Sequence, residues 1–161
     1  MDVAGKVAII TGGSSGVGAA LAHRLAALGA RIVVNYRSSK EDAEQVCAAI
    51  TASGGAAVAV QGDVSIQSDC ARIVQAALDH FGKLDVLVNN AGTTTFVPHH
   101  ELDLLTEDIW LRTLRVNLMG AFFMSRAAAE HMRVSGGAIV MTSSIAGITA
   151  NGSSIAYCAS K

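Results

Sequence analysis

The sequence predicts an α/β fold, a doubly wound parallel sheet with helices packed on both faces. Five short runs of apolar, mostly β-branched residues lack the alternation of half-exposed strands, as expected of strands buried on both faces. Between them lie segments whose apolar residues recur at helical spacing and end at glycines. Strand and helix alternate along the whole chain, and right-handed crossovers then place the helices on both faces of one sheet.

The predicted elements follow one another without a linker, a repeat or a low-complexity segment. The predicted strands are Lys6–Thr11, Arg31–Tyr36, Ala56–Gln61, Leu84–Asn89 and Ala138–Ser143. The apolar positions of the first two predicted helices are Val17, Ala20, Leu21, Leu25 and Leu28, then Ala43, Val46, Cys47 and Ile50. The third and fourth predicted helices are Gln67–Phe81 and the long Thr106–Met132, and a further helix begins near Ser153. No sixth strand follows it, so the fifth strand is expected to form an open apolar edge.

Composition indicates one compact domain over residues 1–161. The chain is 51% hydrophobic and 16% charged, with a formal net charge of −1. Its scattered basic residues give no reason to expect nucleic acid or an anionic membrane as a partner. No apolar run is long enough to span a bilayer, and the N-terminus has an acid, Asp2, where a signal peptide would have bases.

Three cysteines are too few and too scattered for a disulfide framework or a zinc cluster. Cys47, Cys70 and Cys158 are therefore expected to be reduced thiols, which favours a cytoplasmic location. The adjacent His99 and His100 have no further cysteine or histidine at ligand spacing, so no metal site is predicted.

The stretch TGGSSGVG, Thr11 to Gly18, joins the first strand to the first helix. Gly12, Gly16 and Gly18 allow a tight turn and a close approach of the backbone to a ligand. The amides and the dipole at the helix start favour a phosphate. In an α/β sheet this loop predicts a nucleotide site.

The end of the second strand bears on the choice of nucleotide. Where an NAD site usually has an acid the chain has Tyr36, followed by Arg37, Ser38 and Ser39. A guanidinium can pair with a 2′-phosphate through two hydrogen bonds, which favours NADP, with NAD as the alternative. Asp63 and Asn89–Asn90 follow the third and fourth strands, where Asp63 can accept a hydrogen bond from an adenine amino group and the asparagines can tie strand ends together.

The candidate reacting groups are four side chains. Tyr157 and Lys161 are one helical turn apart, and an ammonium near a phenol favours its ionised form, so that the phenol can exchange a proton with an alcohol or carbonyl oxygen. Ser144 follows the fifth strand and its hydroxyl can steady the same oxygen. Asn117 is a poor helix former in mid-helix unless its side chain bonds a specific group.

Together, TGGSSGVG, GDV, NNAG, the asparagine of RVNLMG, the serine of TSSIAG and YCASK resemble the single-domain branch of the short-chain dehydrogenase/reductase family over essentially all 161 residues. The resemblance implies a Rossmann-like sheet in the order 3-2-1-4-5 and hydride transfer between nicotinamide and a secondary alcohol or ketone, such as a 3-oxoacyl thioester. It implies Tyr157 as the acid/base, Lys161 as the residue that lowers the tyrosine pKa and binds the nicotinamide ribose, Ser144 as the partner of the substrate oxygen, and Asn117 as the anchor of a proton-relay water. The resemblance also implies that Tyr157 and Lys161 contact the cofactor. The other cofactor positions that it implies are Gly12, Ser14, Ser15, Gly16, Val17, Gly18, Arg37, Ser38, Asp63, Val64, Asn90, Ala91 and Gly92.

Family members continue beyond the position of Lys161 with strands six and seven and assemble as dimers or tetramers. The chain is therefore expected to be a truncated part of a longer enzyme that is a homodimer or homotetramer. The first alternative is a nucleotide-binding module without catalytic activity, which cofactor binding without turnover would indicate. A second is another Rossmann-like enzyme, such as a methyltransferase, which adenosyl-methionine binding would indicate.

Overall fold

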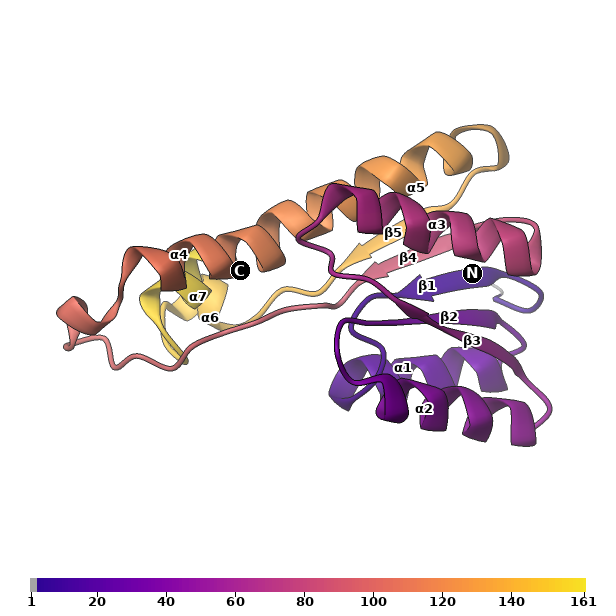
Figure 1. Cartoon of the computed structure of the whole chain (residues 1–161), viewed down its shortest axis with the longest axis horizontal. Helices are drawn as coiled ribbons and strands as arrows, with labels where there is room; N and C mark the ends of the chain where they lie inside the picture. The colour runs from indigo at the N-terminus through magenta and orange to yellow at the C-terminus, as the bar shows by residue number, and fades with distance from the viewer. Residues whose placement is uncertain (1–2) are drawn as a thin grey trace.

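A five-stranded parallel sheet in the order β3-β2-β1-β4-β5 forms the centre of the molecule (Figure 1). The computed structural model describes residues 3–161, apart from the side chains of residues 134 and 135. Asp2, which argued against a signal peptide, lies outside the described residues. The strands are β1 (Val7–Ile10), β2 (Arg31–Tyr36), β3 (Ala56–Gln61), β4 (Val86–Asn89) and β5 (Ala138–Met141). The predicted Rossmann-like fold class and the implied strand order are confirmed.

Helices cover both faces of the sheet. On one face lie α1 (Gly16–Ala27) and α2 (Lys40–Ala52), and on the other α3 (Gln67–Phe81) and α5 (Ala121–Ser135) (Figure 1). The remaining elements are the 3₁₀ turn η1 (Leu102–Leu104), α4 (Glu107–Leu114), the π-helical segment η2 (Arg115–Gly120), α6 (Ala146–Thr149) and α7 (Ile155–Ser160). Three of these, α4, α6 and α7, lie beyond the carboxyl ends of β4 and β5 (Figure 1).

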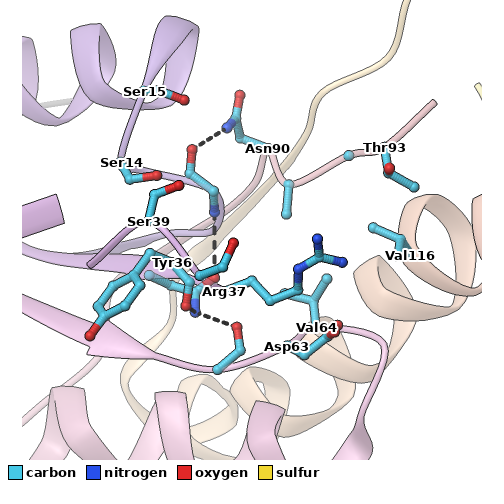
Figure 2. A pocket seen from close by; sticks show the side chains of 16 residues that line it. Ser14, Ser15, Tyr36, Arg37, Ser39, Asp63, Val64, Asn90, Thr93 and Val116 are labelled. Atoms are coloured by element: carbon cyan, nitrogen blue, oxygen red, sulfur yellow. Dashed lines mark hydrogen bonds between the residues drawn. The ribbon is translucent and has the colours of Figure 1, made fainter. Parts of the chain in front are cut away.

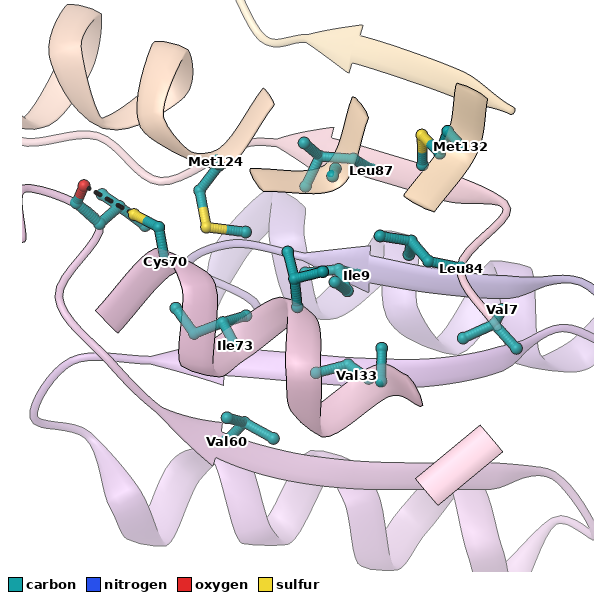
Figure 3. Packing of buried hydrophobic residues seen from close by; sticks show 14 residues of the cluster. Val7, Ile9, Val33, Val60, Cys70, Ile73, Leu84, Leu87, Met124 and Met132 are labelled. Atoms are coloured by element: carbon teal, nitrogen blue, oxygen red, sulfur yellow. Dashed lines mark hydrogen bonds between the residues drawn. The ribbon is translucent and has the colours of Figure 1, made fainter. Parts of the chain in front are cut away.

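The core has two halves because successive side chains of a strand point to opposite faces. In β1, Ile9 packs with the cluster under α3 and α5, which contains Ile73 and Met124 (Figure 3). The neighbouring Ile10 belongs to the cluster under α1 and α2. Both isoleucines are fully buried, which accounts for the unbroken apolar runs in the sequence.

The predicted apolar stripe of α1 is wrong in part. Val17 is 71% exposed and Leu28 is 46% exposed, whereas Gly18, Ala22 and Ala26 form the buried face. The smallest residues face the sheet because the start of α1 contacts the glycine loop so closely that a Cβ at Gly18 would lie 2.3 Å from the Gly12 carbonyl oxygen.

The long helix predicted over Thr106–Met132 is also corrected. The structure divides the stretch into α4, the π-helical η2 and α5. Asn117 lies in η2, and its buried side chain bonds the backbone of Thr93 on a separate segment. A π-helical turn within an α-helix is frequent at functional sites. The hydrophobic period continues through this turn, so the pattern alone could not reveal it.

Within residues 3–161, β5 lies at an edge of the sheet and exposes apolar side chains, as predicted. Ile139, Val140 and Met141 of β5 are 39%, 48% and 55% exposed. Among residues 3–161, no helix is both long and apolar enough to cross a membrane.

Candidate active site

A cavity of about 340 Å³ opens at the carboxyl ends of the central strands (Figure 2). This is the place where open α/β sheets bind ligands. Its walls are the glycine loop, the segment after β2, the turn after β3 and the segment after β4. Ten of the predicted cofactor residues line it, namely Gly12, Ser14, Ser15, Arg37, Ser38, Asp63, Val64, Asn90, Ala91 and Gly92.

Two glycines of the loop have no room for a side chain. Gly12 has φ +62°, and a Cβ there would lie 3.0 Å from the Ala91 Cα atom. At Gly18 a Cβ would lie 2.3 Å from the Gly12 carbonyl oxygen and 2.7 Å from Asn90 Nδ2. The two glycines therefore let the loop pack closely against itself and against the segment after β4, while Gly12, Ser14 and Ser15 line the cavity next to the start of α1, where the helix dipole favours an anion.

Asn90 and Thr11 tie the end of β4 to the end of β1. The Asn90 side chain donates from Nδ2 to the carbonyl oxygens of Thr11 and Gly12, at 3.0 and 3.2 Å. The Thr11 hydroxyl in turn accepts from the backbone amides of Asn90 and Ala91, both at 3.0 Å. Asn89 points elsewhere, with Nδ2 donating to Ser125 Oγ at 3.1 Å and to Met141 Sδ at 3.3 Å. Asn90 thus ties the end of β4 to the end of β1 beside the first cavity, whereas Asn89 ties it to the end of β5 and lines a second cavity.

Asn35 is a lining residue that the sequence analysis missed. It is 2% exposed at the end of β2, and its Nδ2 atom lies 3.2 and 3.0 Å from the carbonyl oxygens of Val60 and Gly62. Its Oδ1 atom accepts from the Gly12 amide at 3.4 Å. Asn35 thereby connects the glycine loop to the end of β3. The available signal was a polar residue in the otherwise apolar run RIVVNY.

Arg37 reaches into the cavity between Ser14 on one side and Asp63 and Val64 on the other (Figure 2). Among residues 3–161, its guanidinium has no hydrogen-bond or ion-pair partner, whereas its carbonyl oxygen accepts from Gln61 Nε2 at 3.1 Å. Ser38 and Ser39 line the same wall. A free guanidinium in a cavity that two serines also line can bind a phosphate.

One carboxylate oxygen of Asp63 is hydrogen-bonded to Ser65, and the other can bind a ligand. Oδ1 accepts from the Ser65 amide at 2.9 Å and from the Ser65 hydroxyl at 2.7 Å. Oδ2 has no partner in the part of the chain that the structure describes. Because Asp63 lines the cavity, Oδ2 can accept a hydrogen bond from a ligand amino group.

Two of the four candidate reacting groups, Asn117 and Lys161, lie next to Gly92. Asn117 and Lys161 line the second, mainly apolar cavity of about 440 Å³. Both approach Gly92 of the first cavity, because a Cβ at Gly92 would lie 3.5 Å from Asn117 Oδ1 and 3.6 Å from Lys161 Nζ. Lys161 Nζ also donates to the Thr142 carbonyl oxygen at 2.9 Å, and burial lowers the pKa of Lys161 below the ordinary lysine value.

Tyr157 and Ser144 line neither cavity, but their hydroxyl groups are available. The Tyr157 phenol has no hydrogen-bond partner among residues 3–161. The Ser144 oxygen accepts from the Ala146 amide at 3.2 Å, which leaves its hydrogen free to donate. Of the other predicted residues, Val17 is exposed and, like Gly16 and Gly18, does not line the cavity.

The residues of the first cavity fit a nicotinamide dinucleotide. The glycine loop is suited to a pyrophosphate, because it lies at the start of a helix. The free Asp63 oxygen is suited to an adenine amino group, and the free Arg37 guanidinium to a ribose phosphate. No group of three or more His, Cys, Asp or Glu side chains that could hold a metal ion occurs within residues 3–161.

The family model for short chain dehydrogenases matches residues 6–161. The chain belongs to the short-chain dehydrogenase/reductase family. This is a family of oxidoreductases that use NAD or NADP, so the family that the motifs indicated is confirmed.

Relatives and solved structures agree with this membership. The chain is 46% identical over 155 residues to "Granaticin polyketide synthase putative ketoacyl reductase 2" of Streptomyces violaceoruber, covering 96% of this chain and 61% of that one. It is 41% identical over 145 residues to the hydroxynaphthalene reductase-like protein Arp2 of Metarhizium majus, covering 90% and 53%. A mutant short-chain dehydrogenase/reductase of Serratia marcescens superposes with a TM-score of 0.89 at 39% identity, covering 100% and 64%. The chain thus spans a little over half to two thirds of the length of these proteins.

Proposed function

We propose that the chain is the cofactor-binding and catalytic part of an NADP-preferring reductase that interconverts a ketone and a secondary alcohol. The observation that carries the proposal is the meeting of the first cavity, at Gly92, with the groups Asn117 and Lys161. When bound, the nicotinamide would supply or accept the hydride.

The first cavity would hold the dinucleotide. The glycine loop and the start of α1 would bind the pyrophosphate, and Asp63 Oδ2 would accept from the adenine amino group. Arg37, with Ser38, would bind the 2′-phosphate, and this interaction is the basis of the proposed preference for NADP over NAD. Lys161, beside Gly92, would bind the nicotinamide ribose.

Three side chains would act on the substrate. Tyr157 would give its phenolic proton to the carbonyl oxygen during reduction and take it back during oxidation. The free Ser144 hydroxyl would donate to the same oxygen and hold it in place. Lys161, four residues after Tyr157, would add a positive charge on the same side of the site.

The substrate class is proposed from the names of relatives. One relative is named a ketoacyl reductase and another a hydroxynaphthalene reductase-like protein, so both an acyclic 3-oxoacyl thioester and a cyclic ketone deserve testing. Assembly as a homodimer or homotetramer is also proposed. It is supported by apolar side chains on one side of α4, η2 and α5, where Leu111, Leu118 and Phe122 are 56%, 57% and 58% exposed. The cytoplasmic location stays a prediction from the sequence.

The test of the proposed function is the variant Tyr157→Phe, assayed with NADPH and a 3-oxoacyl thioester or a cyclic ketone. Loss of the phenol should lower kcat by about 10²-fold or more, the range of a positioned acid/base, while NADPH binding stays close to that of the wild type. Turnover that survives in Tyr157→Phe would exclude the acid/base role. Wild-type protein that binds NADPH but reduces neither substrate class would favour the alternative, a binding module without catalysis.

A further inference from the structure

The side chain of Asn117 forms a hydrogen-bonded junction between η2, Thr93 and Ser160. Its Oδ1 atom accepts from the Thr93 amide at 2.7 Å, and its Nδ2 atom donates to the Thr93 carbonyl oxygen at 2.9 Å and to Ser160 Oγ at 2.8 Å. Both Nδ2 hydrogens are therefore in use, and the side chain is 7% exposed. The two bonds to Thr93 also fix which way the amide faces, because a flipped amide would place Nδ2 against the Thr93 N–H.

Ser160 connects this junction to α7. The Ser160 hydroxyl accepts from Asn117 and donates its own hydrogen to the Tyr157 carbonyl oxygen at 2.8 Å. The Ser160 hydroxyl has one hydrogen, which it donates to the Tyr157 carbonyl oxygen, so its oxygen must accept the hydrogen bond from the Asn117 amide. Ser160 is half-buried and immediately precedes Lys161.

Side-chain hydrogen bonds hold α7 at both ends of the stretch Ile155–Ser160. Its N-terminal end is fixed by Ser154, which is fully buried and whose hydroxyl accepts from the Tyr157 amide at 3.3 Å. At its other end Asn117 Nδ2 donates to Ser160 Oγ, and Lys161 is bonded to the segment after β5 through Ser143 Oγ and the Thr142 carbonyl oxygen. The bond from Asn117 to Ser160 is made next to Gly92 of the dinucleotide cavity, which Asn117 and Lys161 both approach.

We propose that Ser160 is a positioning residue. It holds α7, with Tyr157 and Lys161, at a fixed place relative to Asn117 and to the Gly92–Thr93 end of the cavity. The catalytic meaning of this inference rests on the proposed function, whereas the mechanical role of the junction does not. An alanine at 160 would leave one Nδ2 hydrogen of a buried amide without an acceptor and would remove the bond that joins α7 to Asn117 of η2.

The test compares Ser160→Ala and Ser160→Thr, with Ser53→Ala as the matched control. Ser53 also donates its hydroxyl to a helix carbonyl, that of Ala49 at 3.1 Å, but it is exposed on the far side of the molecule. Ser160→Ala should lower kcat by about 10- to 100-fold, as small misplacements of reacting groups do, with NADPH affinity changed by less than about threefold. Ser160→Thr should recover most of kcat, because a threonine hydroxyl in a helix can still bond the carbonyl three residues earlier.

Amide hydrogen exchange gives a readout that needs no turnover. In Ser160→Ala the amides of Ile155–Lys161 should exchange about tenfold faster than in the wild type, as loss of a hydrogen bond worth about 1.4 kcal/mol predicts, and Ser53→Ala should leave them unchanged. Unchanged exchange of α7 in Ser160→Ala, or a kcat for Ser160→Thr as low as that of Ser160→Ala, would overturn the inference. If the wild type neither binds NADPH nor reduces a ketone, the proposed function fails, and the exchange comparison still decides on the junction.

Discussion

Asn90 and Thr11 hold each other across the base of the dinucleotide cavity. The Asn90 amide donates to the Thr11 carbonyl oxygen at 3.0 Å, and the Thr11 hydroxyl accepts from the Asn90 backbone amide at 3.0 Å. The same Thr11 hydroxyl donates to the Val88 carbonyl oxygen at 3.2 Å. The glycine loop is therefore fixed to the neighbouring strand β4 before any ligand arrives.

Asn90→Ala should loosen the loop. Two buried carbonyl oxygens, those of Thr11 and Gly12, would lose their donor, so the free energy of unfolding should fall by about 1–3 kcal/mol. NADPH affinity should fall by about tenfold, since part of the binding energy would be spent on ordering the loop. Urea unfolding and calorimetric titration measure both. The exposed Asn151→Ala is the control, and equal behaviour of the two variants would contradict the role of Asn90.

Gly18→Ala tests the contact between α1 and the glycine loop. The added methyl group would meet the Gly12 carbonyl oxygen at 2.3 Å, and backbone cannot move aside as a flexible side chain can. We expect a loss of roughly 1–3 kcal/mol in the free energy of unfolding, as in other overpacked sites, together with loss of NADPH binding. At Gly54, by contrast, a Cβ would meet nothing within 4 Å, but its φ of +83° strains an alanine, so Gly54→Ala should lower stability and leave NADPH binding intact. Normal binding by Gly18→Ala would show that the loop can rearrange.

Arg37→Ala tests the proposed preference for NADP. The free guanidinium would lose its hydrogen bonds to the 2′-phosphate, worth about 1.5–3 kcal/mol, so the dissociation constant of NADPH should rise by about 10- to 150-fold. The dissociation constant of NADH, which lacks this phosphate, should change by less than about twofold. Arg24→Ala, an exposed arginine in the last turn of α1, controls for a general loss of positive charge. Equal losses of affinity for NADPH and NADH would count against the preference.

Lys161 should make cofactor binding sensitive to alkaline pH. Burial lowers its pKa, so the side chain is an ammonium below that pKa and becomes neutral above it, at a lower pH than an exposed lysine. If the ammonium binds the nicotinamide ribose, the dissociation constant of NADPH should begin to rise at a pH below the ordinary lysine pKa of about 10.4. Lys161→Arg, which stays charged, should remove this rise. An identical alkaline profile in both proteins would exclude Lys161 as its source.

The strands and the position of the cavity could be predicted because both depend on local patterns. The bounds of β2, β3 and α3 are those that the apolar runs and the helical spacing indicated. The carboxyl ends of parallel strands lie at the same edge of a sheet. The glycine loop, Arg37 and Asp63 follow three such strands and therefore meet at one cavity.

What could not be predicted depends on contacts between distant segments. The π-helical turn coincides with the bonds of Asn117 to Thr93 and Ser160, and none of these partners is visible in a hydrophobic period. The buried face of α1 was mistaken because its closest contact is with the loop at Gly12 rather than with large side chains. Asn35 was missed because three of its four partners belong to other segments of the chain, Gly12, Val60 and Gly62.

The central claim is that the cavity at the carboxyl ends of β1 to β4 binds a nicotinamide dinucleotide. Calorimetric titration of the purified protein with NADPH tests it most directly. We predict a single site with a dissociation constant between about 1 µM and 1 mM, the range of typical enzyme substrates, and weaker binding by Gly18→Ala and Asn90→Ala. A folded protein that shows no heat of binding with NADPH or NADH at millimolar concentration, or that binds adenosyl-methionine instead, would contradict the account.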